Sequence, residues 1–261
     1  MPILDIKDLT IQFGGLKAVS KFNLTLEQGE LVGLIGPNGA GKTTVFNLLT
    51  GVYAPTSGSV TYIAAEGRKY SLGGKAPWRI ARLGMARTFQ NIRLFRQMTV
   101  LDNVKVAIHS SVKYRSLSAI LRLPSFWSEE KRIDLEARAL LAIFGLESKC
   151  EEKAASLPYG EQRKLEIARA LACKPRVLLL DEPAAGMNPQ ETADLSRLIT
   201  FIRDEFKLTI LLIEHDMSLV MKICERLLVL DYGELIAQGL PEEIRNNPQV
   251  IKAYLGEEVA I

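Results

Sequence analysis

The chain has 261 residues, of which 48% are hydrophobic and 24% are charged; this composition is ordinary for a globular protein and suffices for one large core or two subdomains. The net charge of +3 is too small to indicate nucleic-acid binding, so we expect no nucleic-acid partner. The N-terminus lacks a signal-peptide apolar region, and the uncharged stretch 43–65 is too polar to span a bilayer, which predicts a chain that does not cross a membrane.

Two N-terminal stretches, 3–32 and 57–70, alternate apolar and polar residues, as over residues 4–7 and 59–63. A period of two residues is typical of strands that bury one face and expose the other. These stretches therefore predict an antiparallel sheet beside the rest of the fold.

A glycine-rich turn at 36–44 lies between a short apolar strand, 30–35, and a segment with helical spacing that ends at Gly51. The turn reads G-P-N-G-A-G-K-T-T and fits the phosphate-loop pattern G-x-x-x-x-G-K-[ST]. In this context the backbone N–H groups and the helix N-terminus bind a polyphosphate. Lys42 would reach the β- and γ-phosphates, and the Thr43 hydroxyl would bind Mg²⁺. The expected nucleotide-binding residues of this loop are Asn38, Gly39, Ala40, Gly41, Lys42, Thr43 and Thr44.

The middle of the chain, from about 91 to 156, contains no strand-like run. Residues 132–144 have helical spacing and are followed by Gly145, which predicts a helix. The stretch 110–127 is either a partner-binding surface or a locally packed helix pair, and the second is favoured because apolar helix faces are usually core. Its apolar side chains are Tyr114, Leu117, Ile120, Leu121, Phe126 and Trp127.

The last third of the chain contains two apolar strands that end in acidic residues. Residues 157–162 read L-P-Y-G-E-Q and directly precede a helical run, 163–172. The strand 177–181 ends in Asp181-Glu182, and the strand 208–213 is followed by Glu214-His215-Asp216. Both strands are apolar throughout, as is 31–35, which is typical of parallel strands covered on both faces.

The order of these motifs resembles that of the ATP-binding cassette (ABC) ATPases: Walker A at 36–44, Q-loop at 87–91, signature at 157–162, Walker B at 177–183, then the D-loop, and H-loop at 214–216. The resemblance covers essentially the whole chain. Further segments are similar to the ATP-binding subunits of bacterial branched-chain (hydrophobic) amino-acid importers, namely 13–19, 87–90, 94–95, 98–100, 182–189, 244–248 and 253–256.

The resemblance implies an α/β fold with a phosphate-loop NTPase core, built on a mainly parallel sheet, an antiparallel β subdomain and an inserted α-helical subdomain. We expect one ABC ATPase domain over residues 1–261. Residues 1–90 and 163–261 would form the nucleotide-binding core with the β subdomain. Residues 91–162 would form the helical subdomain with the signature.

Phosphoryl transfer to water needs charge neutralisation, an aligned water molecule and exclusion of solvent. Asp181 ends an apolar strand and is expected to hold Mg²⁺, while its neighbour Glu182 would polarise the attacking water. The resemblance implies that Gln90 contacts both Mg²⁺ and the water. It also implies that His215, at the end of a core strand where α/β sites lie, contacts the γ-phosphate.

The resemblance further implies that Phe13 stacks on the adenine and that the small Ala18 leaves room beside the ring. His109 is expected to be structural and without partners, and the three cysteines show no metal or redox spacing, which predicts buried thiols in a reducing cytosol.

The signature departs from the common Leu-Ser-Gly-Gly-Gln form, because Pro158 replaces the serine and Tyr159 the first glycine. A serine hydroxyl on the γ-phosphate is therefore lost. Gly160 and the helix N-terminus remain and can still bind phosphate. The expected binding set here is Pro158, Tyr159, Gly160 and Glu161. In the D-loop, Asn188 stands where aspartate is usual.

The resemblance also implies partners. Two cassettes would pack head to tail as a homo- or heterodimer, each signature completing the other's ATP site. Integral-membrane permease subunits would form the pore, with a substrate-binding protein acting indirectly, so this chain would lie peripherally on the cytoplasmic face of the membrane. Phe95 and Met98, within 91–100, are the expected anchors for a short permease helix.

The leading prediction is the ATP-hydrolysing motor of an importer for branched-chain or other hydrophobic amino acids. One alternative is the ATPase of another ABC transporter, for urea or amide import or lipid export, which would share every catalytic residue. A soluble ABC ATPase acting on nucleic acid is disfavoured, because the chain has neither a long coiled-coil insert nor a second cassette.

Overall fold

The computed structural model describes residues 1–109, 112 and 123–255. The chain forms two compact units, the first being Met1–Arg87 with Arg176–Ile261 and the second Thr88–Pro175. The helical subdomain was expected to end at 162, but that position falls inside helix α6 (Tyr159–Ala172). The whole of α6 belongs to the second unit because it packs on α3 (Val100–Ile108) and α5 (Pro124–Ile143).

The first unit is built on a six-stranded sheet with the order β10-β9-β3-β8-β7-β6. All neighbouring strands are parallel except the β9–β10 hairpin. Every residue of β3, β7 and β8 is buried, which confirms the prediction from their uninterrupted apolar runs. The strands are β3 (Leu31–Ile35), β6 (Met85–Arg87), β7 (Val177–Asp181), β8 (Thr209–Ile213), β9 (Arg226–Asp231) and β10 (Glu234–Gly239).

A second sheet in this unit is antiparallel and has the order β2-β1-β4-β5, as the alternating N-terminal pattern predicted. Its strands are β1 (Pro2–Phe13), β2 (Leu16–Glu27), β4 (Ser57–Ile63) and β5 (Lys69–Ser71). The hydrophobic core lies between the two sheets, where helix α1 (Lys42–Leu49) contributes buried side chains that include Val45 and Phe46.

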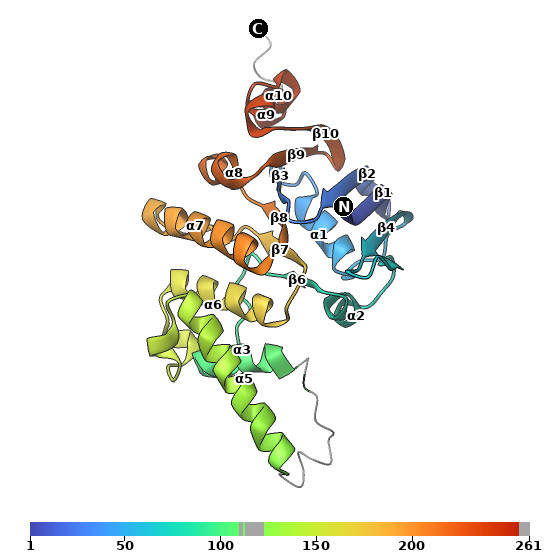
Figure 1. Ribbon diagram of the computed structural model, residues 1–261. Coiled ribbons are helices and arrows are strands. Elements are labelled where there is room, and N and C mark those ends of the chain that lie inside the picture. Colours follow the sequence, from blue (N-terminus) through green and yellow to red (C-terminus); the bar gives the residue numbers. More distant parts are fainter. Residues whose placement is uncertain (110–111, 113–122, 256–261) are drawn as a thin grey trace. The chain divides into compact units, whose positions relative to one another are not determined.

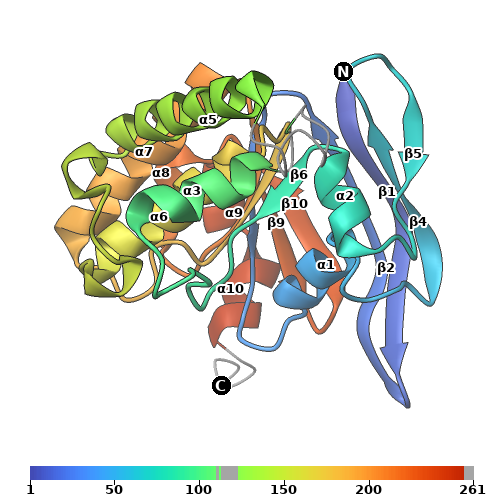
Figure 2. The same ribbon diagram turned by 90° about the horizontal axis from the view of Figure 1, so that it is seen from below.

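The opposite face of the six-stranded sheet carries α7 (Pro189–Phe206) and α8 (Met217–Ile223), as Figures 1 and 2 show. Gly33 permits the close approach of α8, because a Cβ at this position would lie 3.2 Å from Cγ1 of Val220 and 3.1 Å from Sγ of Cys224. The other helices described in this unit are α2 (Pro77–Arg82), α9 (Pro241–Arg245) and α10 (Pro248–Leu255).

In its described residues, the second unit contains α3, α5 and α6 with two 3₁₀ turns, Glu147–Lys149 and Ala154–Ser156. Helix α5 begins at Pro124, earlier than the predicted start at 132, because a proline fits the first helical turn. Its first turn carries Phe126 and Trp127, whose rings meet edge to face at 5.4 Å. The other apolar residues of 110–127 lie outside the described residues. Among the helices that are described, none is long and apolar enough to span a membrane.

Two expectations about individual side chains were wrong. His109 was expected to have no partner, but its Nε2 lies 3.5 Å from Oε1 of Glu130 on α5. The cysteines were expected to be buried, and Cys150 and Cys224 are, whereas Cys173 is exposed because it follows the last turn of α6.

Candidate active site

The phosphate loop joins β3 to α1 and requires glycine at two tightly enclosed positions. Gly36 and Gly41 have φ values of 147° and 102°. A side chain on Gly36 would collide with the carbonyl oxygen of Leu230, and one on Gly41 would lie 2.5 Å from the carbonyl oxygen of Ala18. The loop backbone is therefore packed against β9 and β2, and other residues would be strained there.

Lys42 is folded back into this loop and is only 5% exposed. Its Nζ donates hydrogen bonds to the carbonyl oxygens of Gly36 at 2.6 Å and Pro37 at 2.8 Å. Burial lowers the pKa of Lys42, while the nearby carboxylates of Glu182 and Asp181 oppose that shift. The ammonium group is thus held at the loop by carbonyl oxygens and faces a negatively charged neighbourhood.

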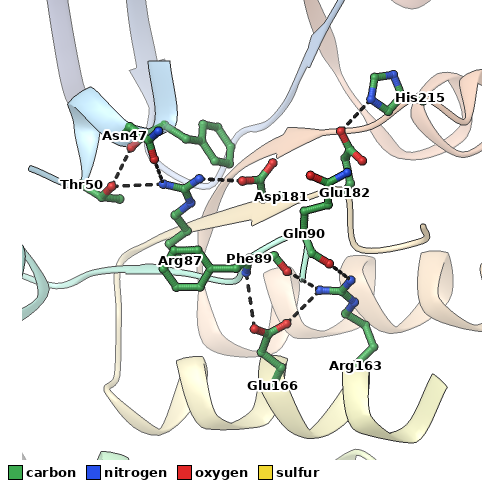
Figure 3. Close-up of polar contacts among 11 residues, drawn as sticks. Asn47, Thr50, Arg87, Phe89, Gln90, Arg163, Glu166, Asp181, Glu182 and His215 are labelled. Atoms are coloured by element: carbon green, nitrogen blue, oxygen red, sulfur yellow. Dashed lines mark hydrogen bonds and ion pairs between the residues drawn. The ribbon is translucent and has the colours of Figure 1, made fainter. Parts of the chain in front are cut away.

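Asp181, at the end of β7, forms a buried ion pair with Arg87, at the end of β6. The distance from Arg87 Nη2 to Asp181 Oδ2 is 2.6 Å, and the side chains are 5% and 3% exposed. Arg87 Nη1 also donates to Asn47 Oδ1 at 2.7 Å and to Thr50 Oγ1 at 3.3 Å (Figure 3). Arg87 therefore fixes the expected Mg²⁺ ligand relative to the helix that follows the phosphate loop.

The sequence pattern predicts no separate role for Arg87. The signal that points to it is the pairing of β6 with β7, which places Arg87 opposite Leu179 and near Asp181. Because β6 is only three residues long, its apolar pattern is too short to predict this pairing.

Glu182 and His215 follow two neighbouring parallel strands, and their side chains meet. Nε2 of His215 lies 2.6 Å from Oε1 of Glu182. In the register of β7 and β8, Asp181 is paired with Ile213, and the N–H of Glu182 donates to the Ile213 carbonyl at 2.9 Å. Glu182 has a φ of +46°, a conformation uncommon for a residue other than glycine, which turns the chain at the strand end.

Glu214 supports this contact from within the protein, although the sequence pattern predicts no role for it. Its Oε1 accepts a hydrogen bond from Ala184 N–H at 2.6 Å, and its Oε2 accepts one from His215 N–H at 3.0 Å. Burial raises the pKa of Glu214, and the backbone amides oppose that shift. Glu214 therefore ties the segment after Glu182 to the segment that carries His215.

Two helix caps hold the loops around these residues. Asp216 caps α8 by accepting from the N–H groups of Ser218 at 2.9 Å and Leu219 at 3.2 Å, and its bonds to Ser218 lower its pKa. Asn188 caps α7, with its Oδ1 accepting from Glu191 N–H at 2.9 Å and Glu191 Oε2 accepting from Asn188 N–H at 3.0 Å. Asparagine suits this capping box, which gives Asn188 a structural role that the motif alone does not show.

Phe13, the residue expected to stack on the adenine, ends β1 and is 46% exposed. Its ring contacts Tyr53 edge to face, with centroids 5.2 Å apart. Ala18 packs against the core, and its carbonyl lies beside Gly41 and Gly233. The structure thus leaves a partly exposed aromatic surface at Phe13 and a small side chain close to the phosphate loop.

Gln90 belongs to the second unit, where the first residues of the segment 88–95 are held by α6. The carbonyl oxygens of Phe89 and Gln90 accept hydrogen bonds from Arg163 Nη1 at 2.6 Å and Nη2 at 2.7 Å (Figure 3). Arg163 is also paired with Glu166 at 2.8 Å, and both side chains are almost fully buried. The sequence pattern predicts a role for neither Arg163 nor Glu166.

The signature forms the beginning of α6 in the same unit. Pro158 is the N-cap residue, and Tyr159, Gly160 and Glu161 form the first turn, so the helix starts four residues before the predicted run at 163. Glu161 is bound by Lys149 Nζ at 2.6 Å and 2.8 Å, and these hydrogen bonds raise the pKa of Lys149. The carboxylate of Glu161 is thus engaged within its own unit.

Mg²⁺ at a nucleoside-triphosphate site usually takes one or two protein oxygens and completes its shell with phosphates and water. Asp181 and Thr43 fit this pattern: Asp181 is a buried carboxylate at a strand end, and Thr43 lies in the exposed part of the first turn of α1. The described residues hold no group of three or more His, Cys, Asp or Glu side chains suited to a metal. A protein-only metal cage is therefore absent from the described part of the chain.

Known proteins match this chain along its length. A family model described as ABC transporter matches residues 19–185, and one described as branched-chain amino acid ATP-binding cassette transporter matches residues 234–260. The chain is 50% identical to the high-affinity branched-chain amino acid transport ATP-binding protein LivG of Escherichia coli and 48% identical to BraF of Pseudomonas aeruginosa, over 98% of each chain. It is 35% identical to the lipopolysaccharide export system ATP-binding protein LptB of Escherichia coli over 99% of both chains.

Solved structures show the same fold. An ATP-binding cassette of an ABC transporter in its ADP conformation has a TM-score of 0.83 at 28% identity, covering 98% of this chain and 100% of that one. A nucleotide-free ATP-binding cassette has a TM-score of 0.81 at 29% identity, with the same coverage. With a family model matching 19–185 and relatives about half identical over almost the whole length, the chain belongs to the ABC transporter family and is an ATP-binding-cassette ATPase.

Proposed function

We propose that this chain is the ATP-hydrolysing subunit of an importer for branched-chain or other hydrophobic amino acids. The ATPase part is supported above all by the Glu182–His215 contact, which lies in the same unit as Lys42 and Asp181. The importer part is supported by the 50% identity to LivG and by the match of residues 234–260 to a branched-chain amino acid cassette model.

The site performs hydrolysis by positioning and charge neutralisation. Mg²⁺, when bound by Thr43 and Asp181, neutralises phosphate charge. The loop amides and Lys42 hold the phosphates, and Lys42 exchanges its carbonyl partners for phosphate oxygens. Glu182 accepts the proton of the attacking water, and His215 keeps the Glu182 carboxylate oriented while it contacts the γ-phosphate. By the family resemblance, Gln90 would contact Mg²⁺ and the water, and Phe13 would stack on the adenine beside Ala18.

The dimer part of the proposal rests on the signature. In the proposed head-to-tail dimer, each ATP lies between the phosphate loop of one chain and the signature of the other. Pro158 offers no hydroxyl, so Gly160 and the N-terminus of α6 bind the γ-phosphate through backbone N–H groups. The partner is a second copy or a sister ATPase subunit.

A hollow on the second unit fits the expected attachment to the permease. Its volume is about 550 Å³, and its lining residues are Phe89, Arg93, Leu94, Phe95, Val106, Ala107 and Arg169. Phe95 is 49% exposed, and the Arg169 guanidinium lies 5.6 Å from its ring centroid. Met98, the other expected anchor, is partly buried, and its carbonyl accepts a hydrogen bond from Ala154 N–H. We therefore keep Phe95 as the anchor for a short permease helix at the cytoplasmic face of the membrane.

The 35% identity to LptB keeps lipid export as the second candidate. For both candidates we expect the membrane subunits to select the substrate. Uptake of labelled leucine separates the two. Cells that lack this chain should lose high-affinity uptake, wild type should restore it, and Lys42→Ala should not. Unchanged leucine uptake in the deletion strain would overturn the import assignment, and an unchanged ATP affinity of Lys42→Ala would overturn the phosphate role.

A further inference from the structure

The side chains of Arg163 and Glu166 form hydrogen bonds to backbone groups of the segment around Gln90. Arg163 has an exposed fraction of 0%, and Nη1 and Nη2 donate to the carbonyl oxygens of Phe89 and Gln90. Glu166 binds backbone donors of the same segment. Its Oε1 accepts hydrogen bonds from the N–H of Arg93 at 3.1 Å and from the N–H of Phe89 at 3.5 Å. The pair therefore binds both donors and acceptors of 89–93, as Figure 3 shows in part.

Tyr159 adds a link from the signature to the same guanidinium. Its hydroxyl accepts a hydrogen bond from Arg163 Nη2 at 3.2 Å, and the ring centroid lies 5.9 Å from the guanidinium carbon. Nη1 binds Phe89 and Glu166, and Nη2 binds Gln90 and Tyr159, so both terminal nitrogens use the forked geometry that only arginine offers. The glycine that is common at position 159 could not make this contact.

We infer that Tyr159, Arg163 and Glu166 are positioning residues that make the signature helix and the Gln90 segment one rigid piece. A displacement of the start of α6 would then carry Gln90 with it. This inference rests on the proposed function, in which the signature binds the partner's ATP and Gln90 serves hydrolysis.

The energetics of the buried Arg163–Glu166 pair indicate that it positions the Gln90 segment and adds little to the stability of the fold. A buried ion pair contributes little net stability, because the cost of removing two charges from water offsets their attraction. Replacing both charges by apolar groups of similar volume is therefore often tolerated, whereas removing one leaves a buried charge without a partner. In contrast, any uncharged residue in place of Arg163 removes two charge-assisted hydrogen bonds, those to the carbonyl oxygens of Phe89 and Gln90.

The central test is the double variant Arg163→Met/Glu166→Leu, with Glu129→Leu/Arg132→Met as its matched control. The control removes another i,i+3 pair from a helix of the same unit, with a contact of 2.9 Å, together with the 2.6 Å contact of Arg132 to Glu136. Both variants should retain the wild-type circular dichroism and unfolding midpoint. In the test variant alone, kcat for ATP should fall about tenfold or more, the scale expected when a catalytic group is displaced. The Mg²⁺ concentration for half-maximal hydrolysis should rise several-fold.

A mutant cycle with Gln90→Ala separates positioning from a general structural effect. If the pair acts through Gln90, the combined variant should be no slower than Gln90→Ala alone, since sites that act as one unit are not additive. Additive losses, or a test variant with normal kcat and normal Mg²⁺ dependence, would overturn the inference.

Two further variants cover the case in which the double variant does not fold. Arg163→Lys keeps a positive charge for Glu166 but lacks the fork, and should lose kcat and Mg²⁺ affinity without additivity with Gln90→Ala. Tyr159→Phe removes one hydroxyl and should lower kcat about two- to fivefold, a scale set by one hydrogen bond, while Tyr70→Phe should not. Wild-type values for both Arg163→Lys and Tyr159→Phe would contradict the inference.

The same measurements distinguish a failure of this positioning role from a failure of the proposed function. A wild-type protein without ATPase activity, or Gln90→Ala with normal kcat, would remove the role of Gln90 and with it this inference. An active wild type with an impaired Gln90→Ala variant, combined with additive losses, would overturn the positioning role alone.

Discussion

Nε2 of His215 lies 2.6 Å from Oε1 of Glu182, although 33 positions separate the two residues in the chain. The contact arises because β7 and β8 are adjacent parallel strands that end at the same edge of the sheet, with Asp181 in register with Ile213. The carboxyl edge of such a sheet is where ligands bind in α/β proteins. The contact thus places the expected base and its partner at the edge that the phosphate loop also occupies.

The first prediction concerns His215→Ala. Loss of the imidazole should lower kcat about 10²-fold, the scale for removing one group that stabilises developing charge, and change ATP affinity little. The natural control is His109→Ala, because the chain has only two histidines and His109 faces Glu130 on the other unit. Steady-state hydrolysis with a titration of nucleotide binding measures both quantities, and equal kcat in the two variants would contradict the role of His215.

Arg87→Met should lower the free energy of unfolding by about 3–5 kcal/mol, because it leaves the buried Asp181 carboxylate without its ion pair. The exposed Arg68→Met should change it by less than about 0.5 kcal/mol. Urea denaturation of both variants measures the difference. A stable Arg87→Met protein would show that Asp181 does not depend on this partner.

Much of the fold was predictable because its signals are local. The apolar runs at 31–35, 177–181 and 208–213, the alternation at the N-terminus and the glycine pattern of the phosphate loop each fit within one element. The predicted start of α6 at 163 was wrong because the proline at 158 is an N-cap and the helix begins directly after it.

The supporting contacts were not predictable, since each joins elements that are far apart in the sequence. Arg87 reaches Asp181 only through the β6–β7 pairing, and Arg163 reaches Phe89 and Gln90 only through the packing of the second unit. Nothing in the pattern around Glu166 distinguishes it from an exposed helical acid, yet its side chain is 1% exposed. A buried charge on a helix can be predicted only when the partner that binds it is known.

ATPase activity per molecule should rise with protein concentration, because the proposed site is completed by the signature of a second chain. The isolated chain should be mainly monomeric without ATP, since nucleotide bridges the interface. Light scattering combined with an activity titration checks both statements. A flat activity in a sample shown to be monomeric would contradict the composite site.

Phe95→Ala should weaken assembly with the permease and reduce transport, because loss of one aromatic anchor costs about 2 kcal/mol or more of binding. Hydrolysis by the isolated subunit should remain near wild type. Phe201→Ala, on α7 of the other unit and equally exposed, is the control. The comparison is ATPase activity of the free subunit against transport by the reconstituted complex. Parallel loss of both activities, or unaffected transport, would remove Phe95 from the docking surface.

The most direct test of the account is hydrolysis by Glu182→Gln measured alongside ATP binding. The amide keeps the shape of the side chain beside His215 but cannot accept the proton of water. Hydrolysis should slow by about 10²–10⁴-fold, the scale of a positioned general base, while ATP binding persists and a dimer with ATP bound accumulates. Turnover near the wild-type rate, with ATP bound normally, would contradict the assignment of Glu182 as the base.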